Sequence, residues 1–143
     1  FDSLNIRDNI LFEKKNFGLL EIIKEVGLDE SVLDLYPSDL SAGMQKRVGL
    51  ARAIFTKPEI LILDEPTTGL DPIMSEQINK LIRKLVEKKK ITTITITHDM
   101  DSVYHFADKV AFINNGSIFW YGDVKKIKSV KKIELKKFIN GTI

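Results

Sequence analysis

The stretch Ile60-Leu61-Ile62-Leu63-Asp64-Glu65-Pro66 indicates the fold class of this 143-residue chain. Four consecutive apolar residues are typical of a strand in a parallel sheet that is covered on both faces. We therefore expect a central strand over residues 60–63 that ends at Asp64 and Glu65. Because ligands bind at the carboxyl ends of the strands in open α/β sheets, these two acids are candidate site residues.

Two adjacent carboxylates at the end of an apolar strand need compensation of their charge. A hydrated Mg²⁺ ion would supply it, since Mg²⁺ takes one or two carboxylates together with phosphate oxygens and water. Neighbouring side chains of a strand point to opposite faces, so Asp64 and Glu65 should differ in role. One would hold the metal shell and the other would address a water molecule. The alternative is a strand-end turn with two solvated acids.

The segments that follow this strand alternate between helix and strand patterns. We expect a helix over residues 72–90 that is capped by Asp71-Pro72, a strand over 91–97, a short helix over about 100–107, and strands over 109–114 and 117–121. The last two flank Asn115-Gly116, which is a strong hairpin signal. This order predicts an α/β core with parallel strands and an antiparallel edge hairpin.

The segments that precede the strand read as helical. An apolar stripe over residues 19–26 stops at Gly27, residues 36–39 form a turn, and Ser41 begins a helix that ends at Lys57-Pro58. The small residues at this helix start, Ser41-Ala42-Gly43, would expose backbone N–H groups and the positive end of the helix dipole to an anion. The alternative is an ordinary serine N-cap.

Composition narrows the functions that the chain can have. It contains no cysteine, which excludes a disulfide scaffold, a cysteine nucleophile and thiolate metal sites. Its net charge is +2, but residues 124–143 hold seven lysines against one acid, Glu134, which makes this tail +6 and the rest −4. Such a tail could contact anionic lipid, nucleic acid or an acidic partner; the alternative is a solvated lysine face. One Trp120-Tyr121 pair offers little stacking surface, so no nucleic acid is expected.

Four segments together resemble the motifs of ABC ATPases, in that family's order. They are the signature motif with its helix (Leu40-Ser41-Ala42-Gly43-Met44 to Ala53), the Walker B strand with the following glutamate (Ile60 to Pro66), the D-loop (Thr67-Thr68-Gly69-Leu70-Asp71-Pro72) and the switch histidine (Thr97-His98-Asp99). The resemblance implies a P-loop NTPase (RecA-like) ABC ATPase core of the α/β class with a helical subdomain. It also implies that the chain has three parts: a helical signature subdomain over residues 1–48, the C-terminal half of the nucleotide-binding core over residues 49–123, and a basic tail over residues 124–143.

The resemblance also implies roles for individual residues. In the family, two ATPase domains pair head to tail and trap ATP with Mg²⁺ between them. Ser41 and the N–H of Gly43 would bind the γ-phosphate across that interface, with Ala42 standing where the family usually has glycine. Asp64 would hold the Mg²⁺ shell, and Glu65 would orient or deprotonate the attacking water. His98 would contact the γ-phosphate, and Asp71 would couple the two sites.

Within the family, residues 36–47 and the ending Lys137-Phe138-Ile139-Asn140-Gly141 are most similar to the ATPase of MCE-type phospholipid transport systems. This resemblance implies membrane permease subunits and an MCE-type substrate-binding protein as partners, and a peripheral position at the cytoplasmic face of the inner membrane. The activity implied is ATP hydrolysis that powers lipid transport. The alternative is a non-catalytic module that docks on a transporter or lends its signature motif to another subunit.

One family motif is absent from the sequence. A phosphate loop has the pattern G-x-x-x-x-G-K-[ST], and no Gly-Lys dipeptide occurs in these 143 residues. The chain also starts with Phe1 rather than methionine. We therefore expect a C-terminal part of an ATPase subunit, with the N-terminal part and its phosphate loop missing, that is inactive alone.

Overall fold

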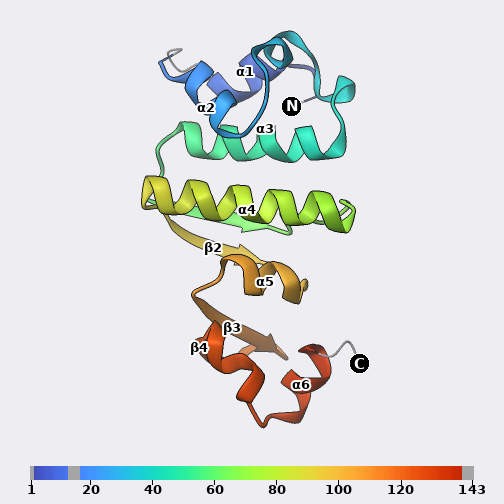
Figure 1. Cartoon of the computed structure of the whole chain (residues 1–143), viewed down its shortest axis with the longest axis vertical. Helices are drawn as coiled ribbons and strands as arrows, with labels where there is room; N and C mark the ends of the chain where they lie inside the picture. The colour runs from blue at the N-terminus through green and yellow to red at the C-terminus, as the bar shows by residue number, and fades with distance from the viewer. Residues whose placement is uncertain (1, 13–16, 140–143) are drawn as a thin grey trace. The chain divides into compact units, whose positions relative to one another are not determined.

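The computed structural model describes residues 2–12 and 17–139, which form two compact units (Figure 1). Unit 1 spans Phe1–Ile96 and unit 2 spans Thr97–Ile143. Phe1, Asn140 and Gly141, which the sequence analysis names, lie outside the described residues. The three-part division at residues 48 and 123 stays a prediction, although helix α3 continues across residue 48.

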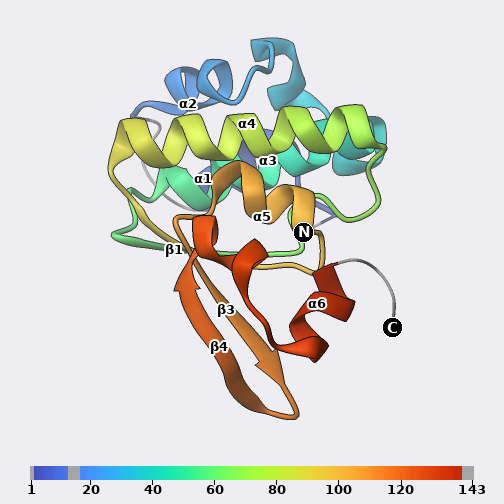
Figure 2. The ribbon, with the colours of Figure 1, turned by 60° about the horizontal axis from the view of Figure 1, so that its bottom comes forward.

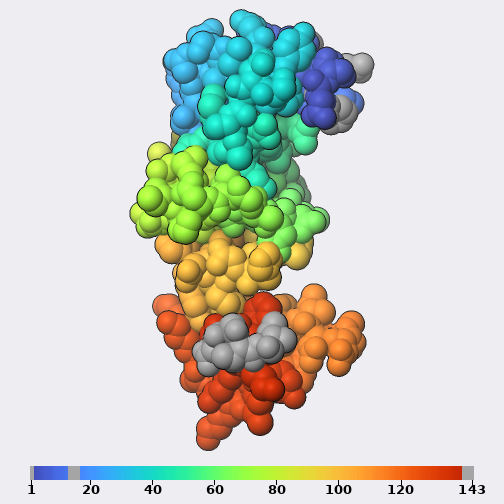
Figure 3. All heavy atoms as spheres, turned by 90° about the vertical axis from the view of Figure 1, so that its right-hand side faces the viewer, coloured from blue at the N-terminus to red at the C-terminus, as the bar shows by residue number. Residues whose placement is uncertain are grey.

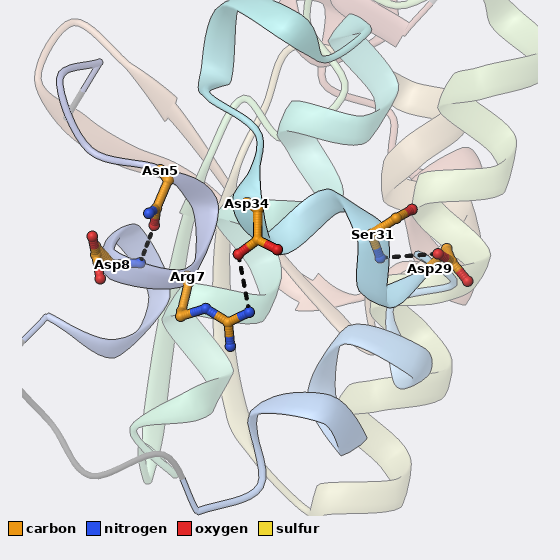
Figure 4. A network of polar contacts seen from close by, with 6 residues as sticks. All are labelled: Asn5, Arg7, Asp8, Asp29, Ser31 and Asp34. Atoms are coloured by element: carbon orange, nitrogen blue, oxygen red, sulfur yellow. Dashed lines mark hydrogen bonds and ion pairs between the residues drawn. The ribbon is translucent and has the colours of Figure 1, made fainter.

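The N-terminal part of unit 1 is helical, as the sequence predicts. Its elements are α1 (Ile6–Leu11), α2 (Leu19–Glu25) and the 3₁₀ turns η1 (Glu30–Asp34) and η2 (Pro37–Asp39). Polar side chains cap these short elements and join them, and Figure 4 shows the contacts. Asn5 Oδ1 accepts from the Asp8 N–H at 2.8 Å, Asp29 Oδ1 accepts from the Ser31 N–H at 2.9 Å, and Arg7 contacts Asp34 at 3.1 Å.

Two longer helices, α3 (Ala42–Phe55) and α4 (Pro72–Lys89), form the middle of unit 1. Each begins where the sequence predicts, because a side chain caps it. Ser41 Oγ accepts from the Met44 N–H at 3.3 Å, and Asp71 Oδ1 accepts from the N–H groups of Ile73 and Met74 at 2.9 and 3.0 Å. Both helices lie on the same side of the β1–β2 sheet in the two ribbon views (Figure 1 and Figure 2).

The sheet of unit 1 consists of the parallel strands β1 (Ile60–Asp64) and β2 (Thr92–Ile96), in register Ile60↔Thr92. On one face, Leu61 is buried at 4% exposure within the helical core. The expectation that β1 is covered on both faces is wrong for the described residues. Ile60 and Ile62 are 60% and 65% exposed, because unit 1 places α3 and α4 on one side only.

Unit 1 has one apolar core, which joins the N-terminal helices to α3, α4 and β1. In the space-filling view the blue N-terminal elements run without a break into the green atoms of α3 and α4 (Figure 3). Gly27 lies at a close approach within it: its φ is +73°, and Arg47 Nη1 donates to the neighbouring Val26 carbonyl at 2.7 Å. A side chain at position 27 would meet that guanidinium.

Unit 2 contains α5 (Met100–Phe106), the antiparallel strands β3 (Lys109–Asn114) and β4 (Ser117–Asp123), the turn η3 (Val124–Ser129) and α6 (Ile133–Ile139). The predicted hairpin is confirmed, since Asn115 and Gly116 both have positive φ, at 48° and 73°. It forms a two-stranded sheet of its own rather than an edge of the β1–β2 sheet. Residues 124–139 of the basic tail are folded here, with Ile127 and Leu135 buried and the lysines at the surface.

Candidate functional site

The small residues Ser41, Ala42 and Gly43 form the start of α3. Ser41 Oγ acts as the N-cap acceptor, and both Ser41 and Ala42 are exposed. Ala42 is not among the residues with positive φ, so alanine in place of glycine causes no backbone strain here. Gly43 is buried because Met74 of α4 covers it, and a Cβ at this position would collide with the Met74 methyl group. The start of α3 therefore packs against the first turn of α4.

Asp64 and Glu65 end strand β1, as the sequence predicts. Asp64 is exposed and follows Ile60 and Ile62 at a spacing of two residues, so its side chain lies on the same uncovered face of the sheet as theirs. Glu65 is half-buried, and its N–H donates to the Ile96 carbonyl at 2.9 Å, one residue beyond the last strand pair. The two acids thus have different surroundings, and their different roles stay a prediction.

Glu65 has an unusual backbone conformation, with a φ of 46° in a residue that is not glycine. Such a conformation costs about 1–3 kcal/mol and persists only where the surroundings hold it. Here the Glu65 carbonyl accepts from the Thr68 N–H at 3.3 Å and from Lys46 Nζ at 3.3 Å. Its carboxylate Oε2 also accepts from Thr68 Oγ1 at 2.8 Å. Contacts to Glu65 therefore come from the next turn and from α3.

Sequence reasoning did not single out Lys46 and Thr68 as residues that position Glu65. The spacing of Glu65 and Thr68 is the one that closes a turn, so this contact had a signal in the sequence. Lys46 lies 19 residues before Glu65. No local pattern predicts that contact, because it depends on how α3 packs against the end of β1.

Asp71 caps α4 with the carboxylate to which the resemblance to ABC ATPases would assign coupling between sites. Its Oδ1 accepts two N–H groups of the first turn, and Pro72 follows at the first helical position. The turn over residues 65–70 connects it to Glu65, with Leu70 N–H donating to the Thr67 carbonyl at 3.2 Å. The capping function is thus established for Asp71, and the coupling function stays a prediction.

His98 belongs to unit 2, where it is exposed and precedes the N-cap of α5. The cap is Asp99, whose carboxylate accepts from the N–H groups of Asp101 and Ser102 and from the Ser102 hydroxyl. Partial burial raises the pKa of Asp99, but these hydrogen bonds and the nearby His98 outweigh it and hold that pKa below its ordinary value. Asp99 therefore stays ionised beside His98 at neutral pH.

The donor set fits part of a Mg²⁺ shell but not a whole one. Across residues 2–12 and 17–139, no three histidine, aspartate or glutamate side chains gather closely enough to hold a metal ion. Mg²⁺ usually takes one or two carboxylates and completes its shell with phosphate oxygens and water. The exposed carboxylate of Asp64 suits this partial role. No helix in the described part of the chain has the length and apolar character needed to cross a bilayer.

Comparisons with known proteins give the fold class that the sequence motifs predict. The ABC transporter family model matches residues 1–68. A solved dimeric structure of the ATP-binding cassette MJ0796 bound to ADP and Pi superposes with a TM-score of 0.72 at 27% identity. It covers 87% of this chain and 58% of that cassette. The chain therefore has the α/β fold of a P-loop ABC ATPase and covers roughly half of it.

Curated relatives extend the match to most of the chain. The methionine import ATP-binding protein MetN of Lactobacillus acidophilus is 42% identical over 132 residues, which are 92% of this chain and 36% of that protein. The energy-coupling factor transporter ATP-binding protein EcfA2 of Latilactobacillus sakei is 38% identical, over 85% of this chain and 45% of that protein. The chain thus spans less than half the length of these relatives.

Proposed function

We propose that this chain contributes to ATP binding and hydrolysis in an ABC transporter, as part of an ATP-binding subunit. The observation that carries the proposal is the support of Glu65. Its backbone and carboxylate are held by Thr68, and its carbonyl also receives Lys46 from the helix that begins with the signature segment. A general base must be held in one geometry to be effective, and these contacts would do this for Glu65.

The proposed roles follow the chemistry of phosphoryl transfer, which needs charge neutralisation and an oriented water molecule. Glu65 would orient or deprotonate that water. The Ser41 hydroxyl and the Gly43 N–H would bind the γ-phosphate of a nucleotide held by a paired subunit. His98 would contact a γ-phosphate, and Asp71 would couple the two sites through the turn that connects it to Glu65.

The proposed cofactors are ATP and Mg²⁺. Mg²⁺ would neutralise phosphate charge when bound, and Asp64 is the residue that would hold its hydrated shell. The phosphate loop is not in these 143 residues, so the remaining nucleotide contacts would come from another polypeptide segment. For that reason we expect no hydrolysis by the 143 residues alone.

The proposed partners are a second ATPase subunit in a head-to-tail dimer and membrane permease subunits, at the cytoplasmic face of the cell membrane. The dimeric MJ0796 cassette supports the first of these. Phospholipid as the transported substrate, with an MCE-type binding protein, rests on the resemblance of residues 36–47 and of the ending Lys137-Phe138-Ile139-Asn140-Gly141. The relatives carry the names of methionine import and energy-coupling factor systems instead. Copurification from the native membrane with an MCE-type protein would decide for phospholipid.

A second candidate function is a non-catalytic module that lends its signature segment in trans. The exposed Ser41 and Ala42 at the start of α3 favour it, since they are accessible to a nucleotide on another subunit. The two candidates differ in the role of Glu65. Glu65 affects ATP turnover only if this chain provides the group that activates the water molecule.

The test joins the part of the MJ0796 cassette that has no counterpart here to residues 1–143, so that a phosphate loop is present. We expect ATP hydrolysis by this chimera, and a loss of at least about 100-fold for Glu65→Gln, with ATP trapped in a dimer. Glu59→Gln, an exposed acid at the opposite end of β1, is the matched control and should keep full turnover. Normal turnover in Glu65→Gln would remove Glu65 from the proposed role and favour the second candidate.

A further inference from the structure

The lysine-rich end of unit 2 is a folded surface. Ile127 of η3 and Leu135 of α6 anchor it, since each is only 1% exposed, and the ring centres of Phe138 in α6 and Phe112 in β3 lie 5.1 Å apart (Figure 2). Every lysine of residues 124–139 is exposed around these anchors. We call these seven side chains the lysine surface: Lys125, Lys126, Lys128, Lys131, Lys132, Lys136 and Lys137. Folded backbone therefore holds these positive charges near one another.

The lysine surface has little negative charge to neutralise it. Glu134 is the one acid in residues 124–139, and Asp123 lies 3.7 Å from Lys126 in an exposed pair of a kind that contributes little. Three of the lysines form no ion pair within the described residues: Lys125, Lys131 and Lys136. Concentrated charge of one sign attracts the opposite sign. The surface is thus complementary to a partner with dense negative charge.

The aromatic rings near the lysine surface are not open platforms. Lys132 Nζ lies 4.2 Å from the ring centre of Phe119, and Lys128 Nζ lies 4.6 Å from that of Tyr104. The exposed ring of Tyr121 on β4 lies beside a lysine of β3 instead. Proteins that bind single-stranded nucleic acid stack bases on exposed rings among their basic residues. The arrangement in unit 2 therefore favours a partner that is attracted by charge without base stacking.

The positive charge of unit 2 comes from lysine alone, since residues 97–143 contain no arginine. Arginine is enriched in protein interfaces and pairs with carboxylates in a fixed fork geometry, whereas lysine is depleted there. Lysine is a hydrated point charge on a flexible stem, which suits attraction to a diffuse layer of charge. Clusters of about four to eight basic residues are typical of surfaces that bind anionic lipid. The composition thus favours a lipid layer over an acidic protein.

Helix α6 (Ile133–Ile139) places one apolar side chain among these lysines. Ile133 is 67% exposed, and the helical spacing puts it on the same face as Lys136 and Lys137, opposite the buried Leu135. Surfaces that lie on a membrane combine lysines at the headgroups with an apolar side chain that enters the acyl boundary. Such an exposed isoleucine has no partner to explain it in a surface that is merely solvated.

We propose that the lysine surface and Ile133 form a docking surface for an anionic lipid bilayer. The lysines contact the headgroup phosphates, and Ile133 enters the boundary between headgroups and acyl chains. This inference goes beyond the proposed function, because it assigns a direct contact with lipid that needs neither nucleotide nor a permease subunit.

The experiment measures lipid binding by the 143-residue chain without nucleotide, so that its outcome is separate from that of the hydrolysis test. The probes are vesicles of phosphatidylcholine alone and vesicles of phosphatidylcholine and phosphatidylglycerol in equal parts. In a sedimentation assay we expect the chain to bind the anionic vesicles at least about tenfold more tightly than the neutral ones. Raising sodium chloride from about 0.1 M to about 1 M should remove most of this difference, because salt screens the charges.

Matched charge variants locate the surface. The test variant changes the three lysines that form no ion pair: Lys125→Gln, Lys131→Gln and Lys136→Gln. The control variant removes the same net charge from exposed lysines of unit 1: Lys24→Gln, Lys57→Gln and Lys84→Gln. We expect the test variant to bind anionic vesicles at least about tenfold more weakly and the control variant to stay within about threefold of the unchanged chain. Both should unfold at the same urea concentration as the unchanged chain, because exposed side chains contribute little to stability.

A second pair of variants tests the apolar contact. Ile133→Ser should weaken binding to anionic vesicles at least about threefold, because it removes the side chain that enters the acyl boundary. Ile73→Ser on α4 changes an isoleucine of similar exposure, 70%, and should bind as the unchanged chain does. Equal binding by these two variants would contradict the role assigned to Ile133.

Three results would overturn the proposal. The first is equal binding to neutral and anionic vesicles. The second is that the lysine test variant binds anionic vesicles as well as its control variant does. The third is that poly-glutamate or single-stranded DNA binds the chain more tightly than the anionic vesicles and that the test variant loses this binding; the occupant would then be an acidic protein or a nucleic acid.

Discussion

The two sides of the β1–β2 sheet differ in how far the chain itself completes them. On the side of α3 and α4, Leu61 is buried and a single core reaches from the N-terminal helices to the strands. On the other side, four isoleucines of the same strands remain exposed. Residue type alone does not separate these positions, since all of them are large aliphatic side chains. The difference is that only one side has a layer of helices to pack against.

The strongest prediction from this comparison concerns two neighbouring residues of β1. Leu61→Ala should lower the free energy of unfolding by about 2–5 kcal/mol, because it leaves a cavity in a closed core. Ile62→Ala should cost about 0.5 kcal/mol or less, because its side chain is largely exposed in the folded chain. Urea unfolding of both variants measures the difference. Equal losses would mean that the outer face is covered in solution.

The next prediction concerns the close packing on the helical side. Gly27→Ala should cost about 1–3 kcal/mol, because a residue with positive φ is strained and the new Cβ meets Arg47 Nη1. Gly18→Ala is the matched control: Gly18 also has a positive φ, of 86°, but no atom lies within 4 Å of the added Cβ. Thermal or urea unfolding should find Gly27→Ala about 1 kcal/mol worse. If the two variants are equally destabilised, the Arg47 contact contributes nothing measurable.

The smallest predicted effect concerns the ion pairs that join α2 to α4. Glu25 contacts Lys88 at 2.5 Å and Lys89 at 2.7 Å. Burial raises the pKa of Glu25, but the hydrogen bonds and charges of the two lysines outweigh it, so the pKa lies below its ordinary value of 4.5. A lowered pKa stabilises the fold above the ordinary value, and this stabilisation is lost as the pH falls through the folded value.

Glu25→Gln should therefore cost about 1–2 kcal/mol at pH 7 and progressively less below pH 4.5, as measured by urea unfolding at pH 7 and pH 3. Glu87→Gln is the control, since the Glu87 carboxylate pairs with Arg83 at the surface of the same helix. It should cost less than about 0.5 kcal/mol. A Glu25→Gln penalty that does not change with pH would contradict the assigned cause.

Much of the local structure could be predicted because its causes are local. Ser41 and Asp71 cap helices through contacts within three residues, and Asn115-Gly116 closes a hairpin through its own backbone preferences. Asp64 and Glu65 were found because an apolar strand that ends in two acids is unusual. Whether both faces of β1 are covered could not be predicted from the apolar run, because the run shows only that the side chains are apolar.

The sequence by itself determined the order of helices and strands, the helix caps, the hairpin and the candidate residues, because these depend on spacing and on neighbours along the chain. Only the tertiary structure decided which face of the sheet is covered, that Lys46 reaches the Glu65 carbonyl across 19 residues, and that Met74 closes over Gly43. These contacts depend on the packing of α3 and α4 against each other and against β1. No pattern within one segment specifies such packing, because it depends on side chains from segments far apart in the sequence.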